Sequence, residues 1–283
     1  MKKGLLIFFL FINTVFGQGW PKTFKVVSGS MENTLMPGNK YKFVPIKYEK
    51  NIKNSVVVFE YPRDRKVNYA SRVIAEPGDT LEIRNRKVFI NGFEQPLPKT
   101  GKYVLPLLSS NYKDQNIFMG KGNKDNFAKT IIPHKGDRIP IGPETALFVM
   151  QLMLMDGHEL ILKNDDGVFH FTMTDPAEVY RRKESIKVFD EYYPNGNLLN
   201  PWSTNMPRGE LFFDGQEIMN LKEYEVEQNY YWAMGDNRDN SLDSRFWGFV
   251  PENYMLGEAL FAYMSLNLDT WVPRFNRIGT IIR

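Results

Sequence analysis

The chain has 283 residues, of which 42% are hydrophobic, and this is enough to bury one large domain or a core domain with an insertion. Its net charge of +3, from 36 basic and 33 acidic residues, is too small and too evenly spread to indicate a nucleic-acid partner. The sequence has no cysteine, and the histidines His134, His158 and His170 lack metal-ligand spacing, so we predict no metal, no other cofactor, and chemistry by hydroxyl, amine or carboxylate groups.

Residues 1–19 are predicted to be an export signal. Two lysines precede a 12-residue apolar run at 5–16, and the chain turns polar from Gly17. A spanning helix needs about 20 apolar residues, so a removed signal peptide and a retained membrane anchor both stay open. The lysines place the N-terminus in the cytoplasm. We expect the body on the periplasmic face of the inner membrane, or soluble in the periplasm after loss of residues 1–17.

The segments that follow predict a mostly β, antiparallel core. Extended or alternating apolar patterns separated by Gly and Pro occur at residues 24–27, 41–44, 56–61, 73–75 and 81–90. Asn91-Gly92 after residues 88–90 is typical of a tight hairpin with positive φ at both turn positions.

The middle of the chain, residues 95–226, is predicted to be a variable, β-rich inserted domain. Residues 148–154 and 160–162 are interpreted as strands, and a helix is expected near 176–185 after Asp175. Dense strand signals return after residue 230. We therefore expect a core built from residues 20–94 and 227–283.

A serine-glycine turn follows the first strand. Ser28-Gly29-Ser30-Met31 could display a serine hydroxyl at a strand end, although an ordinary turn is the commoner interpretation of such a motif. Other segments change this interpretation, because residues 24–35, 55–62, 69–79 and 235–245 together resemble the four sequence boxes of the type I signal peptidases. The last box, from Gly235-Asp236-Asn237-Arg238 to Arg245, is the most specific, whereas Asn33 stands where that family prefers proline.

The resemblance implies an antiparallel signal-peptidase core and a set of roles for the residues at matching positions. Ser30 falls at the nucleophile, and its backbone N–H and the Ser28 hydroxyl fall at the oxyanion hole. Ser241 falls at the residue that orients the catalytic lysine. The positions that match shallow pockets for small substrate side chains are Phe24, Val26, Met31 and Ala70, and ordinary core packing is their alternative. The positions that match charged structural support are Arg72, Asp236, Asp243 and Arg245.

One position departs from the family. The general-base lysine should stand directly before Arg72, but the residue there is Ser71. In the family a buried lysine with a lowered pKa accepts the serine proton, and a hydroxyl has no comparable basicity. No other residue is well placed to act as the general base. The strand positions of Lys25 and Lys66 do not direct their side chains toward Ser30, and the three histidines lie in the insertion. Arg72 is always charged and cannot accept a proton.

Two hypotheses about function follow. In the first, the chain is a serine endopeptidase that cleaves signal peptides from exported preproteins, with Ser30 as nucleophile and an atypical or missing base. In the second, it is a catalytically silent paralogue that binds signal peptides or a partner peptidase. The expected partners are exported preproteins and membrane lipid, and a second signal peptidase is a further candidate.

Overall fold

The structure is a computed structural model that describes residues 22–45, 51–62, 64–165, 167–171, 209–267 and 270–282, without the side chains of residues 64, 66 and 169–171. The predicted export signal and the predicted helix at 176–185 lie outside these residues. No helix within the described ranges is long and apolar enough to cross a membrane. The described chain is mostly β, as predicted, and all of its paired strands are antiparallel.

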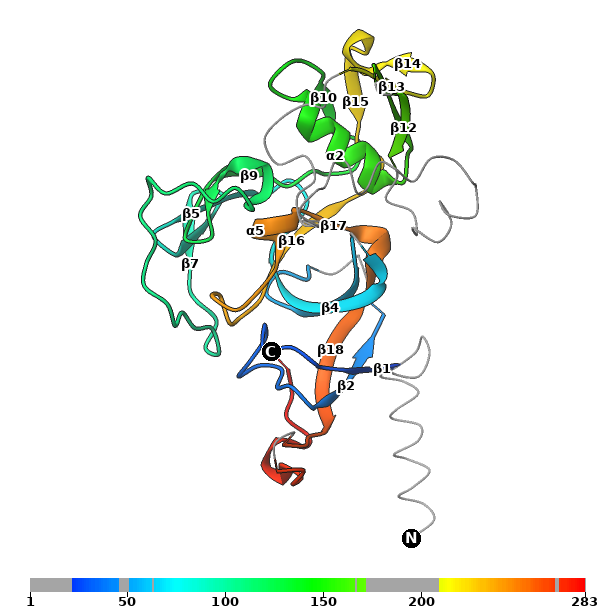
Figure 1. The fold of residues 1–283 in the computed structure, drawn as a ribbon. Coiled ribbons are helices and arrows are strands. Elements are labelled where there is room, and N and C mark those ends of the chain that lie inside the picture. The colour runs from blue at the N-terminus through cyan, green and yellow to red at the C-terminus, as the bar shows by residue number, and fades with distance from the viewer. Residues whose placement is uncertain are drawn as a thin grey trace.

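The largest sheet has seven strands and combines both ends of the chain. Its order is β1-β2-β18-β3-β4-β16-β17. The bounds are Lys22–Lys25 for β1, Lys40–Val44 for β2, Val56–Tyr61 for β3, Asp64–Ala75 for β4, Tyr230–Met234 for β16, Val250–Pro251 for β17 and Met255–Met264 for β18. Strands β2 and β18 lie side by side in Figure 1 although more than 200 residues separate them in the sequence. This sheet pairs early and late strands, and the bounds of the predicted core, 20–94 and 227–283, remain a prediction.

A second sheet of five strands has the order β7-β6-β5-β9-β8. The bounds are Thr80–Arg84 for β5, Lys87–Ile90 for β6, Phe93–Gln95 for β7, Gly122–Asn123 for β8 and Asn126–Ile131 for β9. Asn91 and Gly92 have φ of 53° and 85°, which is the hairpin geometry that their sequence predicts. Because β5 pairs with β9, this sheet extends across position 95, and the domain boundary there remains a prediction.

The two smaller sheets and helix α2 form the upper part of Figure 1. The strand orders are β10-β15 and β12-β11-β13-β14. The bounds are Arg138–Pro140 for β10, Ala146–Asp156 for α2, Leu160–Asn164 for β11, Gly167–Phe171 for β12, Glu210–Phe213 for β13, Gln216–Glu217 for β14 and Glu223–Glu225 for β15. The short helices are η1 at Phe118–Gly120, η2 at Ile218–Asn220, α5 at Ser244–Trp247, η3 at Glu252–Tyr254 and η4 at Phe275–Arg277.

The strand predicted at residues 148–154 was wrong, because this segment is the centre of helix α2. An unbroken apolar run has no period, so it does not distinguish a buried strand from a helix that is buried on most sides. The helix ends at Gly157, whose φ of 99° lets its N–H bond Leu154 and Met153 carbonyls.

One hydrophobic cluster joins the insertion to the main sheet. Trp232 of β16 and Phe249 pack in the same buried cluster as Phe127 of β9 and the methionines of α2. The ring centroids of Trp232 and Phe127 are 5.0 Å apart. The insertion therefore packs against strand β16 and holds it in place. The strand ends at Met234, directly before the loop at 235–245.

Candidate active site

The predicted nucleophile lies on a turn that follows β1. The Val26 N–H bonds the Asn39 carbonyl at 3.0 Å, and the Glu32 N–H bonds the Gly29 carbonyl at 3.0 Å, which closes the turn. Ser28 is exposed and Ser30 is half-buried. Their hydroxyl oxygens are 3.1 Å apart, so the two predicted reactive serines form one hydrogen-bonded pair.

Asn33 gives this turn a conformation that proline could not adopt. Its φ is 78°, in the left-handed region that asparagine tolerates better than most residues. Proline is restricted to φ near −65°. The departure from the family pattern at Asn33 therefore fits the backbone of this turn.

The loop at 235–245 holds the turn by main-chain and side-chain contacts. The Asn237 N–H donates to the Ser30 carbonyl at 2.9 Å, and its side-chain amide donates to the Gly29 carbonyl at 3.0 Å. The Asp236 N–H lies 3.2 Å from the Met31 sulfur. The sequence analysis assigned no role to Asn237, although this residue belongs to the motif Gly235-Asp236-Asn237-Arg238.

Gly235 is needed for this close approach. A Cβ at this position would lie 2.6 Å from the Ser30 carbonyl oxygen and 2.3 Å from the Ser241 hydroxyl. Any side chain at 235 would push the turn or Ser241 away.

Ser71 lies on β4 with only 3% of its surface exposed. It pairs with Val57 of β3, and alternation along the strand places it on the side of Tyr69 and Val73. Val57, Val73 and Tyr69 belong to or pack against one buried apolar cluster, which also contains Trp247. An amine at position 71 would therefore be desolvated, as the family mechanism requires.

The hydroxyl of Ser241 is buried and makes no hydrogen bond to any described group. Leaving a buried polar group unsatisfied typically costs about 1–3 kcal/mol. The position that the resemblance assigns to orienting a lysine ammonium therefore holds a hydroxyl without a partner among the described groups, in a chain that has no lysine at position 71.

Below the turn, Arg72 and Asp236 form a buried ion pair. The guanidinium donates two hydrogen bonds to the carboxylate, at 2.9 and 2.7 Å, and a third at 2.6 Å to the Asn54 carbonyl. The hydroxyls of Thr34 and Thr100 also donate to Asp236, contacts that sequence analysis missed because these threonines carry no motif. Burial acts to raise the pKa of Asp236, but Arg72 and Thr34 lower it below its ordinary value.

A second buried pair, Asp243 and Arg245, fixes the far end of the loop. Both oxygens of Asp243 accept from the guanidinium at 2.8 Å, and one also accepts from the Gly235 N–H at 3.1 Å. Asp243 is also the N-cap of α5. The four residues predicted as charged support thus form two bidentate pairs around the loop.

Among the described groups, no amine or imidazole is hydrogen-bonded to the Ser30 hydroxyl. Lys25 is exposed, and the Lys102 ammonium lies 2.6 Å from Glu32. His158 contacts Glu227 at 2.7 Å in the insertion. The side chains of Lys66 and His170 lie outside what the structure describes.

The four residues predicted to form substrate pockets gather in one place. Val26 and Met31 belong to a single buried cluster, and Phe24 and Ala70 pack against it while remaining partly exposed. Met31 is only 1% exposed, so it lines the base of this cluster. Binding of substrate side chains here remains a prediction.

Two strands near the serine pair have an open edge. Among the described strands, β1 is the outermost of its sheet and pairs only with β2. Strand β4 pairs with β16 only from Arg72 onward, which leaves its first half without a strand on that side within the described residues. An extended peptide can add to edges of this kind.

Comparisons with known proteins place the chain among signal peptidases. The model of the family described as "Signal peptidase, peptidase S26" matches residues 3–264. A signal peptidase I of Buchnera aphidicola subsp. Acyrthosiphon pisum is 27% identical over 278 residues, which are 91% of this chain and 74% of the relative. A signal peptidase I of Aquifex aeolicus is 22% identical over 290 residues, which cover 100% of this chain and 92% of the relative.

A solved signal peptidase I from Enterococcus faecalis V583 is also similar, with 18% identity over 74% of this chain and 96% of that chain. The TM-score is 0.26, an overlap too low to carry information about the fold.

Proposed function

The chain belongs to the signal peptidase family, peptidase S26, whose members are serine peptidases that cleave signal peptides. We propose that Ser30 is the nucleophile of this member and that no amine activates it. The observation that carries the proposal is the pair of hydroxyls of Ser28 and Ser30 at 3.1 Å, in a chain whose position 71 on β4 is a buried serine.

In the proposed reaction, the Ser30 oxygen attacks the scissile carbonyl carbon and forms a tetrahedral oxyanion. The Ser28 hydroxyl and the Ser30 N–H donate to that oxyanion, and the N–H makes no hydrogen bond to a described acceptor. The C–N bond then breaks, the leaving amine takes a proton, and water hydrolyses the acyl-enzyme. During attack the Ser30 proton passes to solvent water, since neither Ser28 nor Ser71 is basic enough to hold it, and solvent returns a proton to the leaving amine.

The proposed substrates are exported preproteins cut after a small residue, added as a strand to the open edges of β1 and β4. The body would act on the periplasmic face of the inner membrane, held by residues 1–19 or released by loss of residues 1–17. Membrane lipid and a second signal peptidase are proposed partners at that surface.

A second candidate function is favoured by one observation, which is that no described base contacts Ser30. The protein would then bind signal peptides, or a partner peptidase, without cutting. The open edges of β1 and β4 do not depend on a proton acceptor at position 71, so binding and turnover are separable here.

The test compares cleavage of an exported precursor by the full-length wild type, Ser30→Ala and Ser71→Lys. We expect slow cleavage by the wild type and an increase of about 10²–10⁴-fold with Ser71→Lys, the usual range for general-base assistance. The increase should grow with pH through a lowered lysine pKa, because only the neutral amine accepts a proton. Ser71→Met, which is similar in length and apolar, is the matched control and should give no increase.

Fast wild-type cleavage that Ser30→Ala abolishes and Ser71→Lys does not raise would refute the missing base and indicate an unrecognised one. For the silent alternative, a photo-reactive signal peptide should cross-link to β1 without yielding product in any of these variants. Cleavage that persists in Ser30→Ala would refute Ser30 as the nucleophile.

A further inference from the structure

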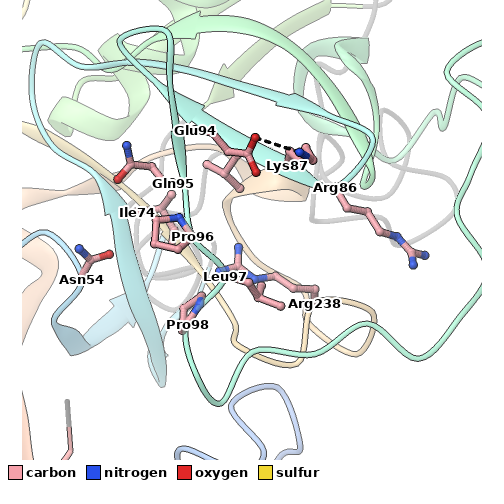
Figure 2. A pocket seen from close by; sticks show the side chains of 11 residues that line it. Asn54, Ile74, Arg86, Lys87, Glu94, Gln95, Pro96, Leu97, Pro98 and Arg238 are labelled. Atoms are coloured by element: carbon pink, nitrogen blue, oxygen red, sulfur yellow. Dashed lines mark hydrogen bonds and ion pairs between the residues drawn. The ribbon is translucent and has the colours of Figure 1, made fainter.

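A cavity lies between the main sheet and the hairpin of β6 and β7, and Arg238 of the last box lines it. Its volume is about 120 Å³. Its apolar lining includes Ile74, Val88 and Leu97, and Figure 2 shows the Arg238 side chain beside Leu97. A cavity of about 150 Å³ can hold benzene, so this one has room for a small organic or inorganic ion.

The guanidinium of Arg238 is buried against this cavity, and no described carboxylate forms an ion pair with it. Arg238 is only 1% exposed, and its Nε makes no hydrogen bond to any described group. Its Nη1 contacts only the sulfur of Met234, at 3.1 Å, and no described carboxylate lies within ion-pair distance. Burial, and then the neighbouring Arg245, lower the pKa of Arg238, but arginine remains charged in proteins.

The other cations that line the cavity are paired. The Lys87 ammonium lies 3.0 Å from Glu94, the contact marked by the dashed line in Figure 2, and Arg86 lies 3.0 Å from Asp125. Among the described residues that line the cavity, Arg238 is therefore the cation without a direct ion-pair partner, although the charges of Asp236 and Asp243 act on it from further away. A buried charge without a partner is unfavourable, and an anion in the cavity would compensate it.

From this geometry we propose that the cavity binds a small oxyanion, a carboxylate or a phosphate, on the free Nε face of Arg238. A guanidinium fork matches the geometry of both groups. The aliphatic walls at Ile74, Val88 and Leu97 suit an anion with a short apolar part. The exposed rim at Leu97 gives the ion a route from solvent.

The test supplies the missing carboxylate from within the chain. Leu97 is 44% exposed and lies beside Arg238 in Figure 2, so Leu97→Glu should place its carboxylate near the guanidinium, and Leu97→Gln is the neutral matched control. Thermal unfolding of the full chain is followed in acetate, inorganic phosphate or glycerol phosphate, at constant ionic strength against chloride. The three arms distinguish a carboxylate, a free phosphate and a phosphate that carries an organic group.

We expect at least one anion to raise the Tm of the wild type and Leu97→Gln by about 2 °C or more, since a ligand that binds only the folded state stabilises it. Leu97→Glu should have a higher Tm without added anion and should lose the anion-dependent shift. Any general salting effect is common to all three proteins.

An equal anion effect in all three proteins, or none, would overturn the proposal. A second measurement does not depend on substitution: the Nε–H resonance of Arg238 should shift with the stabilising anion and saturate. A resonance that does not respond to any of the three anions would equally refute the site.

Discussion

The support layer of the candidate active site and its reactive layer differ in how completely their polar groups are paired. In the support layer, Arg72 and Asp236 make two hydrogen bonds with each other and further contacts with Thr34, Thr100 and the Asn54 carbonyl. In the reactive layer, the Ser28 hydroxyl is the one described group hydrogen-bonded to the Ser30 side chain, and Ser241 has no described partner.

This difference shows that the shape of the site and its proton chemistry depend on different residues. The loop at 235–245 is placed by ion pairs and main-chain bonds that do not involve position 71. A lysine can therefore be absent from that position while the serine pair keeps its geometry. Substitutions in the two layers should have different consequences, on stability in one and on turnover in the other.

The largest effect is expected from removal of the nucleophile after the base has been supplied. In the Ser71→Lys background, Ser30→Ala should lower precursor cleavage by about 10⁶-fold, because nucleophile and base act as a unit. The measurement is the initial rate of precursor cleavage by each protein. Residual cleavage above one-hundredth of the Ser71→Lys rate would mean that the reactive layer does not centre on Ser30.

Removal of a support-layer charge should act on stability. Asp236→Ala leaves Arg72 buried without its carboxylate, and we expect a loss of about 3–5 kcal/mol in the free energy of unfolding. Urea unfolding of the full chain measures this. Ser28→Ala, at an exposed position of the same site, is the control and should change stability by no more than about 0.5 kcal/mol. Similar losses for both variants would contradict the division into two layers.

The same Ser28→Ala substitution should act on turnover instead. In the Ser71→Lys background we expect cleavage to fall by about 10²–10³-fold, the usual effect of removing one oxyanion-hole donor. The fall should be in kcat with little change in KM, since the oxyanion forms only during reaction. An effect confined to KM would place Ser28 in substrate binding.

Acid should weaken the support layer. The pKa of Asp236 is lowered in the folded protein, so its stabilising contribution is present above the unfolded value near 4 and is lost as pH falls through the lower folded value. Unfolding free energies of the wild type and Asp236→Asn, measured from pH 7 to pH 2.5, should therefore converge at low pH. A difference that is constant over this range would mean that Asp236 does not titrate as described.

The smallest effect is expected at Ser241. In the wild type, Ser241→Ala removes an unpaired buried hydroxyl, so stability should change by less than about 0.5 kcal/mol or rise. In the Ser71→Lys background the same substitution should lower cleavage, because the ammonium loses its proposed acceptor. Equal and large losses of stability in both backgrounds would show that Ser241 has a structural partner instead.

The sequence predicted the core strands well because their side chains alternate between a buried and a solvent side, as in Lys40–Val44 and Thr80–Arg84. It did not predict α2, since an apolar run without a period is equally compatible with a strand. The motifs singled out Ser28 and Ser30, whose hydroxyls are hydrogen-bonded to each other, and the roles of the two serines remain a prediction. Nothing in the sequence indicated the unpaired hydroxyl of Ser241 or the unpaired charge of Arg238, because both depend on which groups are absent from the surrounding space.

The close contact at Gly235 limits how much the Ser28–Met31 turn can move when other residues of the site are exchanged. Gly235 has no side chain between its backbone and the Ser30 carbonyl, so contact between the two main chains fixes the position of the serine. Exchanges of neighbouring side chains can add or remove chemistry without moving the serine. Substitution of the single residue at position 71 could therefore remove or restore an amine while the other residues of the site keep their positions.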